Sequence, residues 1–129
     1  MSPNPLLPRT KQFAHRCIRL ALSLPKTLLG NHIRKQLLRC GTSVAANYRA
    51  ACIAPTRRSF ANKLSICAEE ADESAFWMET IIDERVIAYP QSQLLESHPV
   101  SPLLREAEEL TKIFVSSRKT LGQVKDRKL

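Results

Sequence analysis

CGTSVAANYRAA, residues 40–51, is the stretch that decides how this chain folds. Apolar residues recur at helical spacing on both sides of it, yet it contains glycine, threonine, serine and asparagine, which are poorer helix formers than alanine. The stretch has no proline, and the apolar spacing continues through it, so we expect an unbroken helix. Gly41, Ala45 and Ala46 then predict a second helix packed closely against this one, at a cost of about 1 kcal/mol for the glycine.

The close partner of this stretch is predicted to be the next helix along the chain. That helix carries small residues of its own: Ala61, Ala68, Ala71 and Ala75. Asn47 falls on the predicted buried stripe, where a polar side chain tends to fix the register of packing. We therefore predict that Gly41, Ser43 and Asn47 form the contact motif of a tight helix hairpin. A ligand-binding role for Gly41 and Ser43 is the alternative.

Apolar residues spaced alternately three and four apart predict four helices in the 129 residues. We expect helices over about 10–24, 31–54 and 56–88 and a fourth from Ser101 onward, with Asn31 and Ser101 as N-caps. The 3.5-residue repeat and the short connections predict an all-α fold, an antiparallel up-down-up-down four-helix bundle. One domain is expected over residues 1–129, with flexible ends at 1–9 and 123–129.

Charge is divided unevenly along the chain. The net charge is +8, but all 12 acidic residues lie at or after Glu69, so residues 1–68 carry bases without acids. Such asymmetry favours a basic surface that meets an anionic partner. The alternative is that basic and acidic helices pair with each other. Arg34, Lys35 and Arg39 are expected to form such ion pairs with acids of the third helix.

Folding the helices antiparallel brings many bases to one end of the predicted bundle. The candidates for nucleic-acid contacts are Arg9, Lys11, Arg49, Arg57, Arg58, Lys63, Arg118 and Lys119. Arg57 and Arg58 oppose the dipole of their own helix, because positive charge is unfavourable at a helix N-terminus. Residues that reduce helix stability are candidates for function. The alternative is a solvated end that keeps the protein soluble.

Catalytic and metal-binding patterns are absent from the sequence. The histidines lie in separate segments without ligands at metal spacing: His15, His32 and His98. The acids of the third helix lack the Glu-x-x-His repeats of carboxylate metal sites in bundles. The cysteines contain no CxxC pair, and we expect reduced thiols rather than a disulfide set or a zinc site: Cys17, Cys40, Cys52 and Cys67. We expect neither enzyme activity nor a cofactor.

A denser pattern of residues spans 37–80. It contains GTSVAANYRAA (41–51) and SFANKLSICAEEADESAFWME (59–79), and it resembles the bacterial four helix bundle protein family. That family includes proteins encoded in intervening sequences of large-subunit ribosomal RNA genes and the accessory variability determinant of diversity-generating retroelements. The matching positions are Gly41, Thr42, Ser43, Val44, Ala46, Asn47, Phe60, Lys63, Leu64, Ile66, Glu70, Ala71, Glu73 and Trp77. Ala50 departs from the pattern, since many relatives carry Glu there.

The resemblance implies a bundle that assembles as a barrel-like homopentamer. It also implies nucleic-acid binding in the retroelement branch, where the protein accompanies a reverse transcriptase, and it carries over no catalytic residue. A second apolar stripe on the third helix and the Phe76–Trp77 pair, expected to be exposed, indicate more apolar surface than one core uses. Phe76 and Trp77 are therefore predicted at an oligomer interface.

The sequence thus predicts a non-catalytic, oligomeric bundle that binds RNA or DNA through phosphate contacts. Base readout is not expected, because no recognition helix or set of stacking aromatics is present. A cytoplasmic location is expected, since the N-terminus lacks a signal-peptide layout and no apolar run approaches the roughly 18 residues of a membrane helix. The alternative is a structural or adaptor oligomer that binds a protein partner and has no nucleic-acid role.

Overall fold

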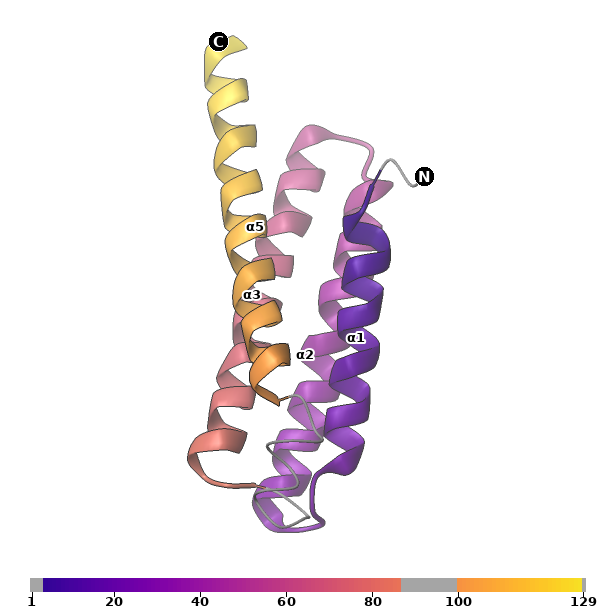
Figure 1. Ribbon diagram of the computed structural model, residues 1–129. Coiled ribbons are helices and arrows are strands. Elements are labelled where there is room, and N and C mark those ends of the chain that lie inside the picture. The colour runs from indigo at the N-terminus through magenta and orange to yellow at the C-terminus, as the bar shows by residue number, and fades with distance from the viewer. Residues whose placement is uncertain (1–3, 87–99, 129) are drawn as a thin grey trace.

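The computed structural model describes residues 4–86 and 100–128, with 122–128 as backbone alone, and these residues form four α-helices. The helices are α1 (Leu6–Ser23), α2 (Leu28–Cys52), α3 (Arg57–Asp83) and α5 (Val100–Lys128). The described residues contain no strand, so the predicted all-α class is confirmed for this part of the chain. Figure 1 shows the four helices side by side, with the start of α1, the α2–α3 turn and the C-terminal end of α5 at one end of the molecule.

α1 begins at Leu6, earlier than the predicted start at Thr10, so part of the segment 1–9 is helical. Pro8 lies in the first turn, where its missing N–H does no harm because amide groups there have no partner inside the helix. Thr10 is buried, and its hydroxyl donates to the carbonyl oxygen of Leu6 at 2.8 Å. The early start therefore satisfies a polar group that the core encloses.

α2 begins at Leu28 with Thr27 as its N-cap, so the prediction of Asn31 as the cap is wrong. The Thr27 hydroxyl oxygen accepts a hydrogen bond from the Gly30 N–H at 3.0 Å. A Cβ atom at position 30 would lie 2.1 Å from the carbonyl oxygen of Pro25. The tight α1–α2 turn therefore requires glycine at this position, and this fixes where α2 starts.

α3 and α5 also differ at their ends from the predicted bounds. Thr56 caps α3 in a reciprocal pair with Ser59, but α3 ends at Asp83 rather than near residue 88. Arg85 adopts a φ of 53°, and the N–H of Val86 donates to the Ile81 carbonyl at 3.0 Å, a left-handed arrangement that ends helices. α5 already includes Val100, so Ser101 lies inside the helix and is not its N-cap.

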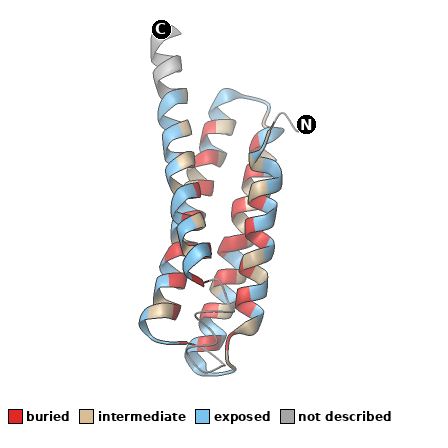
Figure 2. Ribbon diagram, viewed as in Figure 1, coloured by how far each residue is buried: buried red, intermediate tan, exposed pale blue. Residues whose placement is uncertain are grey.

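Side chains from all four helices form the apolar core, and Figure 2 shows the buried residues along the facing sides of the helices. The predicted stripe of α2 is correct except at Asn47, which is half-buried, while Tyr48 is buried at 6% exposure. The Tyr48 ring lies 5.8 Å from that of Phe114. Helical spacing allows either Asn47, three residues after Val44, or Tyr48, four residues after it, to face the core. Tyr48 takes the core position because its large aromatic ring buries more apolar area.

The helices do not pack equally against one another. α2 packs extensively against α1 and α3, and α3 against α5, whereas α1 and α5 contact each other much less. Figure 1 shows α5 diverging from α1 towards its C-terminal end. The side of the molecule between these two helices is therefore the less tightly closed one.

Candidate nucleic-acid interface

The end of the molecule that holds the α2–α3 turn collects basic side chains from four helix ends (Figure 1). We call this surface the basic end. It is defined by Lys11, Arg49, Arg57, Arg58, Lys63, Arg118 and Lys119. All of them are exposed except Lys63, which is half-buried. None forms an ion pair with a carboxylate within the described side chains.

Arg9, the eighth candidate, has a different environment. Its guanidinium donates two hydrogen bonds to Glu106 of α5, at 2.8 and 2.7 Å, and lies 3.1 Å from a carboxylate oxygen of Glu109. The hydrogen bond to Glu106 raises the pKa of Arg9 above its ordinary value. Arg9 therefore links α1 to α5 and has its charge largely balanced inside the protein, unlike the residues of the basic end.

Arg57 and Arg58 occupy the first turn of α3, directly after the Thr56 cap. That turn contains no acidic residue, so the positive end of the helix dipole and two guanidinium groups lie together. Arg118 approaches the same helix from α5, and its Nε donates to the Ser65 hydroxyl at 3.1 Å. The first turns of α3 thus carry Arg57 and Arg58 at the helix start and Arg118 about two turns further on, an arrangement of positive charge that favours anions.

Two arginines away from this end, Arg39 and Arg34, bind groups within the protein. Arg39 pairs with Glu70 at 3.1 Å and with Glu73, so the predicted ion pairing with α3 is confirmed for Arg39. The prediction is wrong for Arg34, whose guanidinium donates instead to carbonyl oxygens at the end of α1: those of Ala21, Leu24 and Pro25. Lys35 is exposed and has no ion pair among the described residues.

The motif of Gly41, Ser43 and Asn47 makes contacts within the protein. Gly41 is buried and faces Cys17 of α1, so the predicted close partner, α3, is wrong: the tight contact is between α1 and α2. The Asn47 amide nitrogen donates to the carbonyl and hydroxyl oxygens of Ser43 at 2.9 and 2.8 Å. These bonds span one turn of the same helix and hold the Asn47 side chain against α2.

The Phe76–Trp77 pair divides into an exposed and a half-buried residue. Phe76 is 55% exposed, and its ring centroid lies 4.9 Å from that of Trp77. Trp77 also contacts the His32 ring at 5.3 Å and donates its indole N–H to Glu73 at 3.1 Å. Trp77 is therefore anchored between α2 and α3, and Phe76 is the member of the pair that presents an apolar surface.

The described residues hold no cluster of His, Cys, Asp or Glu that could bind a metal ion. The four cysteines are free thiols, of which Cys52 is exposed. His15 and His32 are exposed and belong to different helices, and His98 lies outside the described residues. In the same part of the chain, no helix has the length and apolar character needed to span a membrane.

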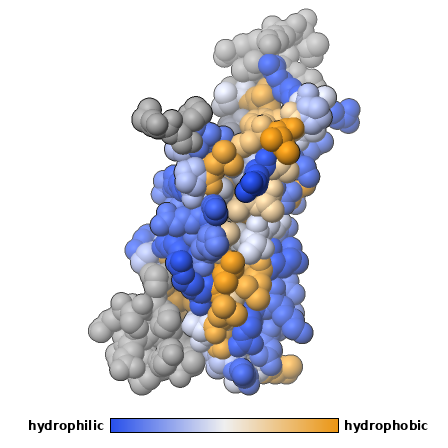
Figure 3. Space-filling view, turned by 90° about the vertical axis from the view of Figure 1, so that its right-hand side faces the viewer, coloured by the Kyte–Doolittle hydropathy of each residue, from blue (hydrophilic) through white to orange (hydrophobic). Residues whose placement is uncertain are grey.

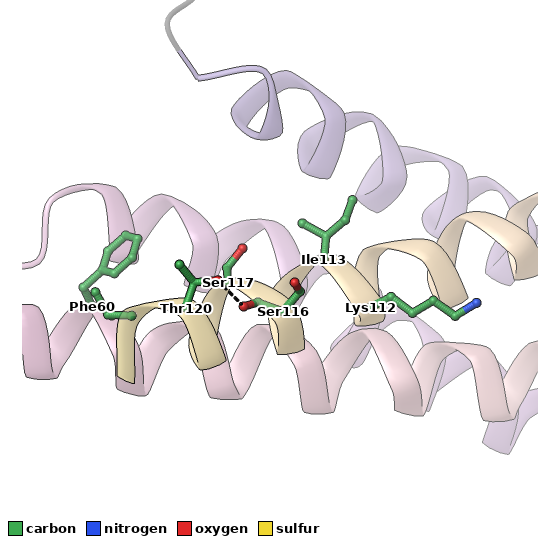
Figure 4. A pocket seen from close by; sticks show the side chains of 7 residues that line it. Phe60, Lys112, Ile113, Ser116, Ser117 and Thr120 are labelled. Atoms are coloured by element: carbon green, nitrogen blue, oxygen red, sulfur yellow. Dashed lines mark hydrogen bonds between the residues drawn. The ribbon is translucent and has the colours of Figure 1, made fainter. Parts of the chain in front are cut away.

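A groove between α3 and α5 was not predicted from the sequence. It lies beside the basic end and is lined by Phe60 of α3 and by residues of the last described turns of α5 (Figure 4). Phe60 and the Ser–Ser–Thr series at 116, 117 and 120 are visible in the sequence. Only the packing angle between the two helices brings them to one surface.

Comparisons with known proteins extend the resemblance found in the sequence. A crystal structure of a protein with unknown function from the S23 ribosomal protein family of Bacteroides thetaiotaomicron VPI-5482 is 30% identical to this chain, with a TM-score of 0.67; the match covers 88% of this chain and 97% of that one. Among curated proteins, none matches. A sequence model described as 23S rRNA-intervening sequence protein matches residues 6–116. The chain therefore belongs to the 23S rRNA-intervening sequence protein family.

Proposed function

We propose that this protein is a non-catalytic, oligomeric bundle that binds RNA or DNA through phosphate contacts at the basic end. One observation carries the proposal: the residues of the basic end are exposed or, for Lys63, half-buried and form no ion pair with a described carboxylate, whereas Arg9 and Arg39 are paired with acids. A chain with 12 acidic residues could have balanced these charges too. Uncompensated positive charge on one surface is what a polyanion recognises.

Phosphate contact, rather than base readout, follows from the kind of side chains present. Arginines at a helix N-terminus supply paired N–H donors, which form strong, charge-assisted hydrogen bonds to phosphate oxygens. Arg57 and Arg58 both lie in that position. Such contacts orient a protein on nucleic acid without reading its sequence.

Self-association is the second part of the proposal. Phe76 at 55% exposure, together with Leu28 at 92% and Ile53 at 81%, leaves large apolar side chains uncovered. Figure 3 shows apolar patches among hydrophilic residues on the face where α1 lies. We infer a closed ring of up-down-up-down bundles, with five copies on the strength of the family resemblance, in which Phe76 lies at the interface and the basic end is repeated around the ring. Light scattering at micromolar concentration tests this, and a monomer would contradict it.

Two finer parts of the proposal come from no contact in the structure. A reverse transcriptase as protein partner comes from the family resemblance, and a cytoplasmic location comes from the sequence pattern alone. Co-purification of this protein with a reverse transcriptase encoded nearby in the genome tests that partner directly.

A gel-shift titration against salt tests nucleic-acid binding. We expect similar affinity for unrelated RNA and DNA duplexes, falling steeply with salt, and each lost phosphate contact lowers the slope of log K against log salt by about 0.7–0.9. Replacing both Arg57 and Arg58 by Glu should weaken binding to every sequence. The matched control replaces Lys26 and Lys35 by Glu, since these exposed lysines lie away from the basic end and the change in net charge is the same.

The competing function is an adaptor oligomer that binds a protein partner. The exposed apolar side chains named above favour it, because apolar patches are also used for protein contacts. Equal weakening by the two double variants, or binding that is insensitive to salt, would contradict the phosphate-contact proposal and favour the adaptor.

A further inference from the structure

The groove between α3 and α5 has the dimensions of a ligand site. It is an open groove of about 560 Å³, lined by Phe60 of α3 and by α5 residues between Lys112 and Leu121. Sites for small organic groups typically measure roughly 300–1,000 Å³. The groove is therefore large enough for one planar ring with its substituents, and its openness allows the rest of a longer ligand to remain outside.

The lining of the groove combines apolar and hydroxyl side chains. Phe60, Ile113 and Leu121 supply the apolar part, and all are half-buried. Ser116, Ser117 and Thr120 supply hydroxyl groups. Figure 4 shows the α5 residues in a row along the helix, with Phe60 of α3 near the Thr120 end of that row. The groove thus offers an aromatic ring beside hydrogen-bonding groups.

Charge is positive in the lining of the groove and at its Phe60 end, whereas Glu108 and Glu109 lie one turn before Lys112 on α5. Lys112 is the charged residue of the lining, which includes no carboxylate. Arg57 and Arg58 precede Phe60 in the first turn of α3, and Arg118 follows the lining serines and reaches across to Ser65. The basic end adjoins the Phe60 end of the groove, so charge complementarity there favours an anion that also carries a flat, partly polar group.

Single-stranded nucleic acid meets these requirements. We propose that the groove takes one unpaired nucleobase, stacked on Phe60, while neighbouring phosphates contact the basic end. Stacking on an aromatic ring is tolerant of sequence because every base has a π-face. A duplex does not offer such a base without unpairing it. This inference rests on the proposed function and adds to it a preference for unpaired strands.

Affinities for a single strand and for a duplex of the same sequence test the inference. Phe60→Leu keeps the apolar volume and removes the ring, so single-strand affinity should fall roughly five- to hundredfold while duplex affinity is retained. Phe60→Tyr keeps the ring and should bind like the parent. A 2-aminopurine base in the strand should be quenched on binding by the parent and by Phe60→Tyr, but much less by Phe60→Leu.

A second pair of variants tests the groove without changing Phe60. Ser116→Leu fills the groove from an exposed position and should weaken single-strand binding selectively. Val115→Leu is the matched control, because Val115 is 41% exposed on the same helix and does not line the groove. If Phe60→Leu and Ser116→Leu bind the single strand as the parent does, the inference is wrong, although salt-dependent duplex binding would still support the proposed function. Loss of the oligomer in either variant, measured by light scattering, would assign the groove to self-association and also overturn it.

Discussion

Gly41 of α2 lies directly against Cys17 of α1: a Cβ atom on Gly41 would be 2.5 Å from the Cys17 Cβ and 2.8 Å from its Sγ. Both residues are buried, and Cys17 is 0% exposed. Contacts this short do not occur between real side chains, so the two helices can approach this closely only with glycine at position 41. The close packing of α1 against α2 therefore requires glycine at position 41, as their turn requires it at position 30.

Gly41→Ala should destabilise the protein. In a helix without close neighbours, this change raises stability by about 1 kcal/mol, because alanine is the better helix former. Here we expect the opposite sign, a loss of about 1–3 kcal/mol, since the added methyl group overpacks the contact with Cys17. Denaturant unfolding measures the change. Ala46→Leu, at an exposed position of the same helix, is the control and should unfold like the parent, whereas a more stable Gly41→Ala protein would contradict the contact.

Arg34 joins the end of α1 to α2. Its Nε donates to the Ala21 carbonyl at 3.2 Å, and its Nη2 donates to the carbonyls of Leu24 and Pro25. The Ala21 carbonyl also accepts from the Leu24 N–H at 3.2 Å, whereas Leu24 and Pro25 lie beyond the last residue of α1. Hydrogen bonds to a charged donor contribute about 1.5–3 kcal/mol each. Because Arg34 is only half-buried, we expect Arg34→Met to lower the free energy of unfolding by about 1–2 kcal/mol in total. Lys35→Met should change the unfolding free energy little, and equal effects of the two variants would show that the capping role is absent.

Helical periodicity was sufficient to predict most of the core. The stripe predicted for α1, from Phe13 to Leu24, is buried. The stripe predicted for α3, from Phe60 to Ile81, is buried from Leu64 onward, whereas Phe60 is half-buried. Periodicity works here because a helix that packs on one side must repeat its apolar residues at that spacing. It also indicated that α2 continues through Gly41, which the structure confirms.

Periodicity could not predict which neighbour each face meets. Gly41 packs against α1 rather than α3, and Arg9 binds Glu106, a residue 97 positions away in sequence. Both contacts depend on how the helices are rotated and inclined relative to one another, and a repeat of three and four residues carries no such information. The groove at Phe60 likewise depends on how α5 lies against α3, since its lining joins residues of both helices.

Glu73 should make the protein sensitive to acid. Burial raises the pKa of Glu73, but hydrogen bonds from Arg39 and Trp77 outweigh it and hold this pKa below the ordinary value of 4.5. A carboxyl group with a depressed folded-state pKa stabilises the fold above its unfolded pKa, and this stabilisation is lost as the pH falls through the folded pKa. We therefore expect the melting temperature to drop as the pH is lowered below 4.5, and to drop less in Glu73→Gln.

The fluorescence of Trp77, the single tryptophan of the chain, reports the same titration locally. Its indole N–H donates to the Glu73 carboxylate, so protonation of Glu73 should change the emission. Glu69→Gln is the control, because Glu69 is exposed on the same helix and has no ion pair among the described residues. If the melting temperature and the Trp77 emission change with pH in the same way in the parent and in Glu73→Gln, the Glu73 carboxylate does not contribute to the acid sensitivity.

The thiols of the native protein should differ sharply in reactivity. Cys52 is exposed, while Cys17, Cys40 and Cys67 are buried. Burial raises the pKa of Cys40 to about 11 and the pKa of Cys67 to about 12, which leaves little of the reactive thiolate at neutral pH. A thiol reagent such as Ellman's should therefore modify Cys52 rapidly and the other three only after unfolding, and Cys52→Ser should remove the fast phase.

Cys52 also reports on the basic end, because it is the last residue of α2 and follows Arg49 by less than one turn. If nucleic acid binds there, a saturating duplex should slow the modification of Cys52 at low salt, and raising the salt should restore the rate as phosphate contacts are lost. The protection should disappear when Arg57 and Arg58 are both replaced by Glu and persist when Lys26 and Lys35 are replaced. A modification rate that a bound duplex leaves unchanged would locate the phosphate contacts elsewhere on the molecule.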